Sequence, residues 1–114
     1  MDSISCDFQL SFEDWLECRN IHETEAAGLK RHRADYLLFN AEPRSFFAND
    51  QGWIYADSSG KASYDWDDLI GVAYNRRVIT LMAANGHCHL PRSAFDPNQL
   101  ATLMRWLSVA MGES

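Results

Sequence analysis

The stretch that decides the fold of this 114-residue chain is RSFFANDQGWIYAD, from Arg44 to Asp57. Residues 44–48 and 52–57 are rich in aromatic and apolar side chains, which are typical of short strands. Residues 49–52 contain the Asn and Gly that tolerate the backbone angles of a tight turn. The stretch therefore predicts an antiparallel hairpin.

The pattern of short apolar segments separated by turns continues toward the C-terminus. Turns are expected at residues 58–61, at Asn75-Arg76 and at Asn85-Gly86, the last being a strong hairpin signal. Further strands are predicted between and after these turns, at residues 62–66, 69–74, 77–83 and 87–90. Six short strands at regular spacing are typical of an antiparallel meander that curls or closes.

Before the meander, residues 4–10 alternate, with Ile4, Cys6, Phe8 and Leu10 on one face. This period of two predicts a half-buried strand. Ser11 and the acid three residues later then resemble a capping box. We expect one helix from residue 12 to residue 30, with the basic run at residues 30–33 near its C-terminal end, where it suits the helix dipole.

After the meander, Asp96, Pro97 and Gln99 have the positions of an N-cap, a first helical residue and a capping-box partner. The helix that they open is expected to end at residue 111. It carries an apolar stripe formed by Leu100, Leu103, Met104, Leu107 and Met111. Because such a stripe must be buried, the helix should cap the open face of the sheet. The prediction is a single α+β domain over residues 1–114, divided into 1–42, 43–91 and 96–111.

Composition narrows the function classes. The mass is 13.0 kDa, the apolar fraction is 46% and the formal net charge is -6. An acidic chain is a poor default partner for nucleic acid. The N-terminus lacks the basic and apolar regions of a signal peptide, and no run approaches the roughly 18 apolar residues of a membrane span. Three cysteines without a CxxC pair favour the reducing cytoplasm.

Three motifs carry a resemblance to a known family. They are residues 49–54, with their glycine turn, residues 63–70 (SYDWDDLI) and residues 89–95 (HLPRSAF) before a capped helix. The chain resembles the YcxB-like family of bacterial proteins over residues 49–111. Residues 6–22 resemble the opening strand and helix of that family more weakly.

The resemblance implies a β-domain like that of pleckstrin-homology (PH) proteins. The family typically inserts a pair of membrane helices before the β-domain. Here the span from residue 23 to residue 42 is too short and too charged to form them, so we expect no membrane insertion. The resemblance brings no catalytic residue with it.

Several constellations could carry chemistry. His87 and His89 share a strand face and could hold Zn²⁺ with His22, His32 or an acid, but a second ligand pair at suitable spacing is missing. Asp65, Asp67 and Asp68 could act as acid–base groups or bind Ca²⁺, but a solvated strand end is the simpler interpretation. No nucleophile elbow or phosphate loop is present. We therefore expect neither an enzyme nor a cofactor.

The basic run Lys30-Arg31-His32-Arg33 could bind anionic lipid or phosphate, although a helix end is the simpler interpretation. Trp53 and Tyr55 share one strand face. They are interface anchors if Ile54 and Ala56 point inward and core residues if the register is reversed.

The candidate protein-binding surface consists of Trp53, Tyr55, Tyr74 and the acids Asp65, Asp67 and Asp68. An acidic surface of this kind attracts basic proteins. The expected function is a non-catalytic module that binds another protein, in a regulatory or scaffold role. The alternatives are an immunity protein that neutralises a basic toxin enzyme, a regulatory homodimer related to membrane-anchored proteins, and a metal-dependent enzyme.

Overall fold

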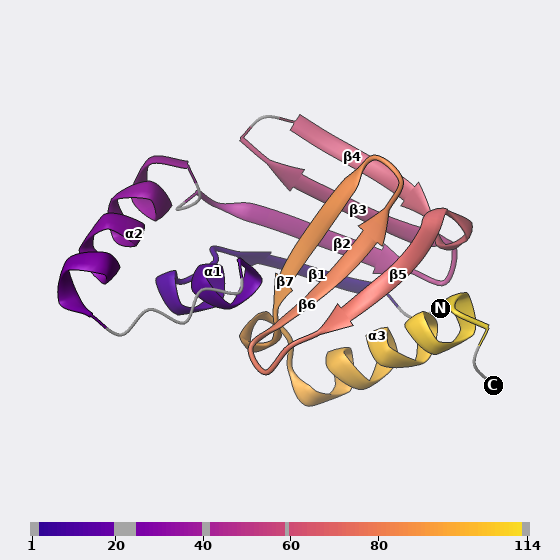
Figure 1. The fold of residues 1–114 in the computed structure, drawn as a ribbon. Helices are drawn as coiled ribbons and strands as arrows, with labels where there is room; N and C mark the ends of the chain where they lie inside the picture. The colour runs from indigo at the N-terminus through magenta and orange to yellow at the C-terminus, as the bar shows by residue number, and fades with distance from the viewer. Residues whose placement is uncertain (1–2, 20–24, 40–41, 59, 113–114) are drawn as a thin grey trace.

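The structure is a computed structural model that describes residues 3–19, 25–39, 42–58 and 60–112. In these ranges the chain forms strands, three α-helices and two short 3-10 helices (Figure 1). The strands are β1 (Ser3–Phe8), β2 (Arg44–Asn49), β3 (Gly52–Asp57), β4 (Gly60–Asp65), β5 (Leu69–Tyr74), β6 (Val78–Ala83) and β7 (Gly86–Pro91). The helices are α1 (Phe12–Cys18), α2 (Ala26–Phe39), η1 (Trp66–Asp68), η2 (Arg92–Ala94) and α3 (Pro97–Ala110).

The strands form two antiparallel sheets, one with the order β1-β2-β3-β4 and one with the order β5-β6-β7. The turn η1 interrupts the meander and separates the sheets. β1 is added at the edge of β2, from the Ser3–Asn49 pair to the Phe8–Arg44 pair. The α+β class with an N-terminal strand–helix segment and a C-terminal helix is confirmed.

The core lies between the sheets and under α3. Strand parity turns Phe46, Trp53, Leu81 and Cys88 inward, and all of them are buried. α3 begins with the predicted capping box, in which the Asp96 side chain accepts from the Gln99 N–H at 2.7 Å. Its stripe is buried through Leu103 and Leu107 among other residues. The helix therefore covers the sheets, as its amphipathic pattern predicts.

The prediction of one helix over residues 12–30 is wrong. α1 ends at Cys18, and α2 begins at Ala26. The chain doubles back, because the Tyr36 ring lies 6.0 Å from the Trp15 ring. A continuous helix would place these two residues about 30 Å apart, since it rises ~1.5 Å per residue. Residues 20–24 of the predicted helix lie outside the described residues.

The molecule is elongated, with extents of 47 × 28 × 27 Å. Figure 1 shows α2 beyond one end of the sheets, where it packs against α1. The Tyr36 hydroxyl also donates to the Leu10 carbonyl, which fixes this helical pair to the end of β1. Among the described residues, no helix has both the length and the apolar character needed to cross a bilayer.

Candidate functional site

Trp66 organises the end of the molecule opposite α2. Its indole Nε1 donates to the Asn49 carbonyl at 2.8 Å, and its backbone N–H donates to the Gln51 carbonyl at 3.2 Å. These bonds join η1 to the turn between β2 and β3. The Trp66 ring also lies 5.0 Å from Trp53 and 6.2 Å from Trp106 of α3. Two turns and a helix therefore meet at one rigid corner.

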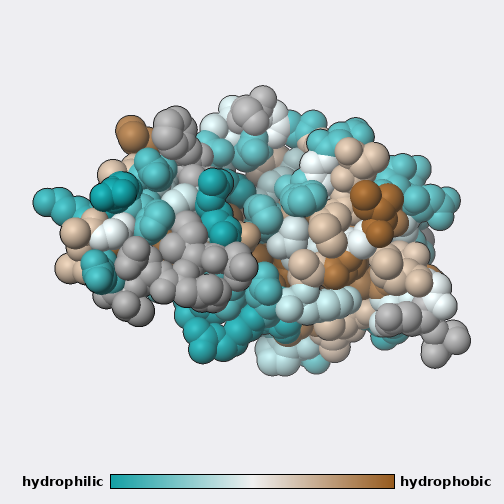
Figure 2. Space-filling view, in the orientation of Figure 1, coloured by the Kyte–Doolittle hydropathy of each residue, from teal (hydrophilic) through white to brown (hydrophobic). Residues whose placement is uncertain are grey.

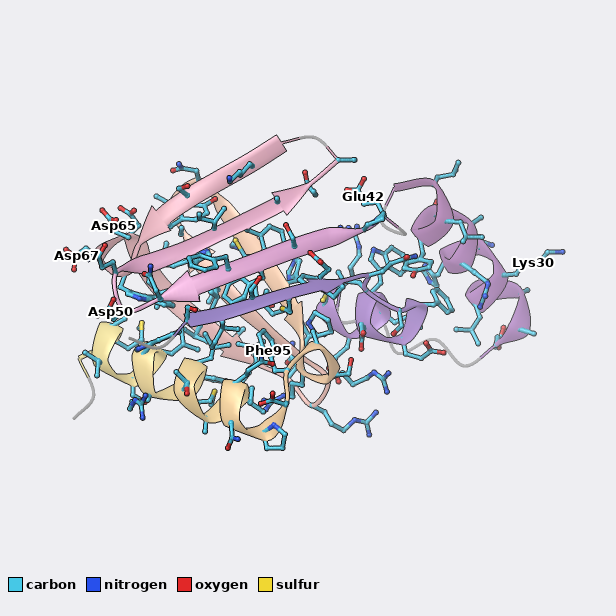
Figure 3. The ribbon with its side chains drawn as sticks, turned by 180° about the vertical axis from the view of Figure 1, so that it is seen from behind. Lys30, Glu42, Asp50, Asp65, Asp67 and Phe95 are labelled. Carbon is cyan, nitrogen blue, oxygen red and sulfur yellow. The ribbon has the colours of Figure 1, made fainter. Side chains whose placement is uncertain are left out.

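Four carboxylates surround this corner, and all of them are exposed. We call the group Asp50, Asp65, Asp67 and Asp68 the acidic corner. Figure 3 shows Asp50, Asp65 and Asp67 gathered at one end and Lys30 at the other. The Asp68 carboxylate accepts from the Asp65 N–H at 2.9 Å, which closes the turn. Four like charges at a fixed spacing produce a negative potential over this end.

The elements that meet at this corner also carry exposed apolar side chains. Ile70, at the start of β5, is 67% exposed, and Val109, one turn beyond Trp106 on α3, is 71% exposed. Figure 2 shows brown, apolar surface over the second sheet toward this end of the molecule. Exposed apolar side chains next to a charged rim are typical of protein-interaction surfaces.

Trp53 and Tyr55 are not part of the surface, which corrects the expectation that they anchor a partner. Trp53 is 1% exposed and Tyr55 is also buried. The pairings of β3 with β2 and β4 place these two rings on the inner face with Phe46 and Tyr64. The reversed register, in which they are core residues, is therefore right.

Tyr74 is exposed, but the structure does not place it beside the acids. It stands at the far end of β5 from Leu69, which directly follows the acidic corner. Five steps along a strand span about 17 Å. Of the six predicted surface residues, only Asp65, Asp67 and Asp68 lie together.

A chain of hydrogen bonds crosses the other end of the core. Arg44 Nη1 donates to the Tyr55 hydroxyl at 2.9 Å, and that hydroxyl donates to the His89 carbonyl at 3.1 Å. The His89 ring nitrogen Nδ1 lies 2.9 Å from the Thr80 hydroxyl. Burial lowers the pKa of His89, and the positive charge of Arg44 adds to this effect. The imidazole is therefore held neutral near pH 7.

Burial raises the pKa of the Cys6 and Cys18 thiols to about 11, and it also raises the pKa of Cys88. All three cysteines are free. A thiol with a raised pKa is protonated at neutral pH and is a weak nucleophile. These cysteines therefore behave as packing residues.

His87 and His89 lie on one strand face, with ring centroids 6.3 Å apart. His22, a predicted third ligand, lies outside the described residues. His32 lies on α2 instead, where its ring centroid is 6.4 Å from that of Trp15 on α1. Within the described residues, no three His, Cys, Asp or Glu side chains gather as a metal site requires.

An open cleft of about 390 Å³ lies between the β3–β4 and β6–β7 hairpins. Tyr55 and Tyr64 line it from the first sheet, and His87 and Cys88 line it from the second. The residues that line the cleft include few charged groups. Lys61 is the one cation among these lining residues. Its polar lining shows no arrangement of a nucleophile with a base.

The basic run lies in the middle of α2, not at a helix end as expected. One of its side chains packs on α1: the Arg33 guanidinium lies 5.5 Å from the centre of the Phe12 ring. Cation–π contact of this kind stabilises the pairing of α2 with α1. The helix dipole explanation therefore does not apply.

Asp50, Ile70 and Val109 are additions that the sequence did not suggest. Asp50 could have been found, because the hairpin register pairs Gly52 with Asp65 and so brings the preceding turn to the acids. Ile70 follows the buried Leu69, so the alternation of β5 places it on the opposite, exposed face. The register shift between Leu69 and Gly71 lies at the same point of the strand.

Comparison with protein-family models, with curated proteins and with solved structures finds no match for this chain. The YcxB-like resemblance therefore stays a prediction that depends on its three sequence motifs. The geometry of the acidic corner is the remaining guide to function.

Proposed function

We propose that this protein is a non-catalytic binding module that holds a basic protein partner at the acidic corner. One observation carries the proposal: four exposed carboxylates lie at the turns that Trp66 joins, and the adjoining β5 and α3 carry the exposed apolar residues Ile70 and Val109. Carboxylates steer a basic partner into place, and apolar contacts then lengthen the life of the complex.

The rigidity of the corner supports this role. Trp66 ties η1 to the β2–β3 turn through two hydrogen bonds, and its ring packs at an angle near those of Trp53 and Trp106. A surface that is ordered before binding loses little conformational entropy when the partner arrives.

The proposed compartment is the cytoplasm, because the three free cysteines favour a reducing environment.

The test compares three baits in an affinity capture from the native cells, with quantitative mass spectrometry. The baits are the wild type, the double variant Asp50→Lys/Asp67→Lys and the control Glu13→Lys/Asp35→Lys. Each double variant changes the formal charge from -6 to -2, because each reversal adds two units. All four replaced acids are exposed, and the control acids lie on α1 and α2.

The expected result is a basic partner whose recovery falls about tenfold with the corner variant and stays near the wild-type level with the control. Equal recovery by all three baits would contradict the proposal. If the partner is a toxic enzyme that the protein inhibits, the narrower role is that of an immunity protein.

A further inference from the structure

The described strands leave four sheet edges, at β1 and β4 of the first sheet and at β5 and β7 of the second. Three of these edges are obstructed or irregular. β1 lies against η2, the His89 carbonyl of β7 accepts from Tyr55, and β5 carries the register shift before Gly71. An irregular or covered edge is a poor template for another strand.

β4 is different, because it is regular and open. It pairs with β3 without a bulge from the Gly60–Asp57 pair to the Asp65–Gly52 pair. Every residue of β4 except Tyr64 is exposed. Figures 1 and 3 show β4 along the rim of the first sheet, with no element beyond it. Its outer N–H and C=O groups can therefore accept a further strand.

The sequence of β4 is complementary to itself when it is read antiparallel. With Ser63 placed opposite Ser63 of a second copy, Lys61 stands opposite Asp65 and Ala62 stands opposite Tyr64. Directly opposed residues share one face of a sheet, at about 5 Å between Cβ atoms. This register makes two symmetric Lys–Asp pairs on the outer face.

We propose that the chain forms a symmetric homodimer by antiparallel pairing of β4 with β4 of a second copy, centred on Ser63. The occupant of the edge follows from charge. Lys61 is the only basic residue between Arg44 and Arg76, and it forms no ion pair within the part of the chain that the structure describes. In the proposed register the second copy places a matching carboxylate, that of Asp65, directly opposite Lys61.

The inner face of the pairing is also favourable. The Tyr64 ring stacks on Trp53, with centroids 4.8 Å apart and an angle of 19° between the rings. In the dimer Ala62 of one copy meets Tyr64 of the other, so the aromatic row continues across the interface without a steric conflict between two large side chains.

This pairing is isologous, so it closes on itself and yields a dimer instead of a fibre. It goes beyond the proposed function and does not depend on it. The dimer would use Asp65 of the acidic corner, whereas Asp50 and Asp67 lie outside β4 and stay available to a partner in each copy. The two proposals can therefore fail separately.

The test is sedimentation equilibrium over a range of protein concentrations. The wild type should show a monomer–dimer equilibrium. Either single reversal, Lys61→Glu or Asp65→Lys, replaces two attractive pairs by two repulsive ones and should raise the dissociation constant about tenfold or more. The double variant Lys61→Glu/Asp65→Lys restores both pairs in exchanged order and should recover the wild-type dissociation constant.

Matched controls place the same charge changes away from the edge. Asp67→Lys lies in η1 and Lys30→Glu lies on α2, and both residues are exposed. Neither should change the dissociation constant by more than about twofold, the residual effect of net charge. Circular dichroism of every variant reports whether the fold is retained.

A second measurement does not depend on charge. Ser63→Cys should form a disulfide-linked dimer under mild oxidation, because the two thiols face each other across the two-fold axis. Ser5→Cys, on the exposed face of the other edge strand β1, should form no disulfide-linked dimer, and neither should the wild type with its native cysteines.

A wild type that stays monomeric up to its solubility limit would overturn the proposal. So would a dimer that tolerates both single reversals, or a double variant that dissociates as easily as the single ones. Cross-linking of Ser5→Cys to the same extent as Ser63→Cys would likewise rule out β4 as the specific interface.

Discussion

At the scale of single residues, Gly52 shows how closely the backbones of β3 and β4 approach each other. A Cβ atom at this position would stand 2.0 Å from the Tyr64 carbonyl oxygen. Because that neighbour is backbone, it cannot move aside as a flexible side chain could. The acidic corner depends on this approach, since Gly52 begins the strand that follows Asp50.

We expect Gly52→Ala to lower the free energy of unfolding by about 1–3 kcal/mol, the usual cost of overpacking. Urea denaturation followed by circular dichroism measures this change. Gly86→Ala is the control, because no atom lies within 4 Å of the added Cβ. Equal stability of the two variants would show that the close approach is unimportant.

His89 predicts a pH dependence of stability. Its pKa is lowered in the folded state, first by burial and then by the positive charges around it. The unfolded chain therefore binds a proton more readily, and the folded state loses stability as the pH falls below about 6.5, the unfolded value. Above that pH the contribution of His89 is fully present.

We expect His89→Gln to flatten the loss of stability between about pH 7.5 and about pH 5.5, by at most about 1.4 kcal/mol per pH unit for one proton. Thermal or urea unfolding at several pH values gives the slope. The control is His87→Gln, on the exposed neighbour of the same strand face. An unchanged slope in His89→Gln would contradict this account.

Sequence could predict that Trp53 and Tyr55 share a face but not which face that is. Both sides of β3 carry apolar side chains, because Ile54 and Ala56 are themselves half-buried. Alternation then gives no direction. The direction is fixed by partners on other strands, such as Phe46 on β2 and Cys88 on β7, which the pattern within β3 does not contain.

At the scale of elements, α3 was predicted almost to the residue because its signals are local. A capping residue, an N-terminal proline and an apolar stripe define its start and its buried face. The strands were predicted equally well by their turns. The prediction of one helix over residues 12–30 was wrong because the fold-back depends on a contact of Trp15 with Tyr36, a residue beyond the end of the predicted helix.

The burial of α3 can be measured directly. Leu107 is fully buried, and we expect Leu107→Ala to lower the free energy of unfolding by about 2–5 kcal/mol. The exposed Val109 on the same helix is the control, and Val109→Ala should change stability by no more than about 0.5 kcal/mol. Similar small effects in both variants would mean that α3 does not seal the core.

An ion pair joins α1 to the second sheet. Arg77 Nε donates to Asp14 Oδ1 at 2.9 Å, and Asp14 is only 4% exposed. The Arg77 N–H also donates to the Glu17 carboxylate. α1 is thereby held to the turn between β5 and β6, and α2 in turn rests on α1.

We expect Arg77→Gln to increase amide hydrogen exchange in α1 about tenfold, because the buried Asp14 loses its charged partner. Exchange measured by mass spectrometry reports this change by segment. Arg76→Gln, at the exposed neighbouring position, should leave the rates unchanged. Equal exchange in the two variants would show that packing of Phe12 and Trp15 suffices to hold α1.

At the scale of the whole molecule, charge is distributed along the long axis. The acidic corner occupies one end, and Lys30, Arg31 and Arg33 lie on α2 at the other. The net charge of -6 indicates an acidic protein but does not reveal this separation. The sequence predicted Asp65, Asp67 and Asp68 as a group. It could not show that the contact between Trp66 and Trp106 brings α3 to them.

The most direct test of the central claim is a hydrogen-exchange footprint of the complex with the captured partner. If the acidic corner is the binding surface, amides in residues 49–52 and 65–70 should exchange more slowly in the complex. α2 should exchange at its free rate. Protection confined to α2 or to the cleft beside His87, with the acidic corner unchanged, would contradict the account.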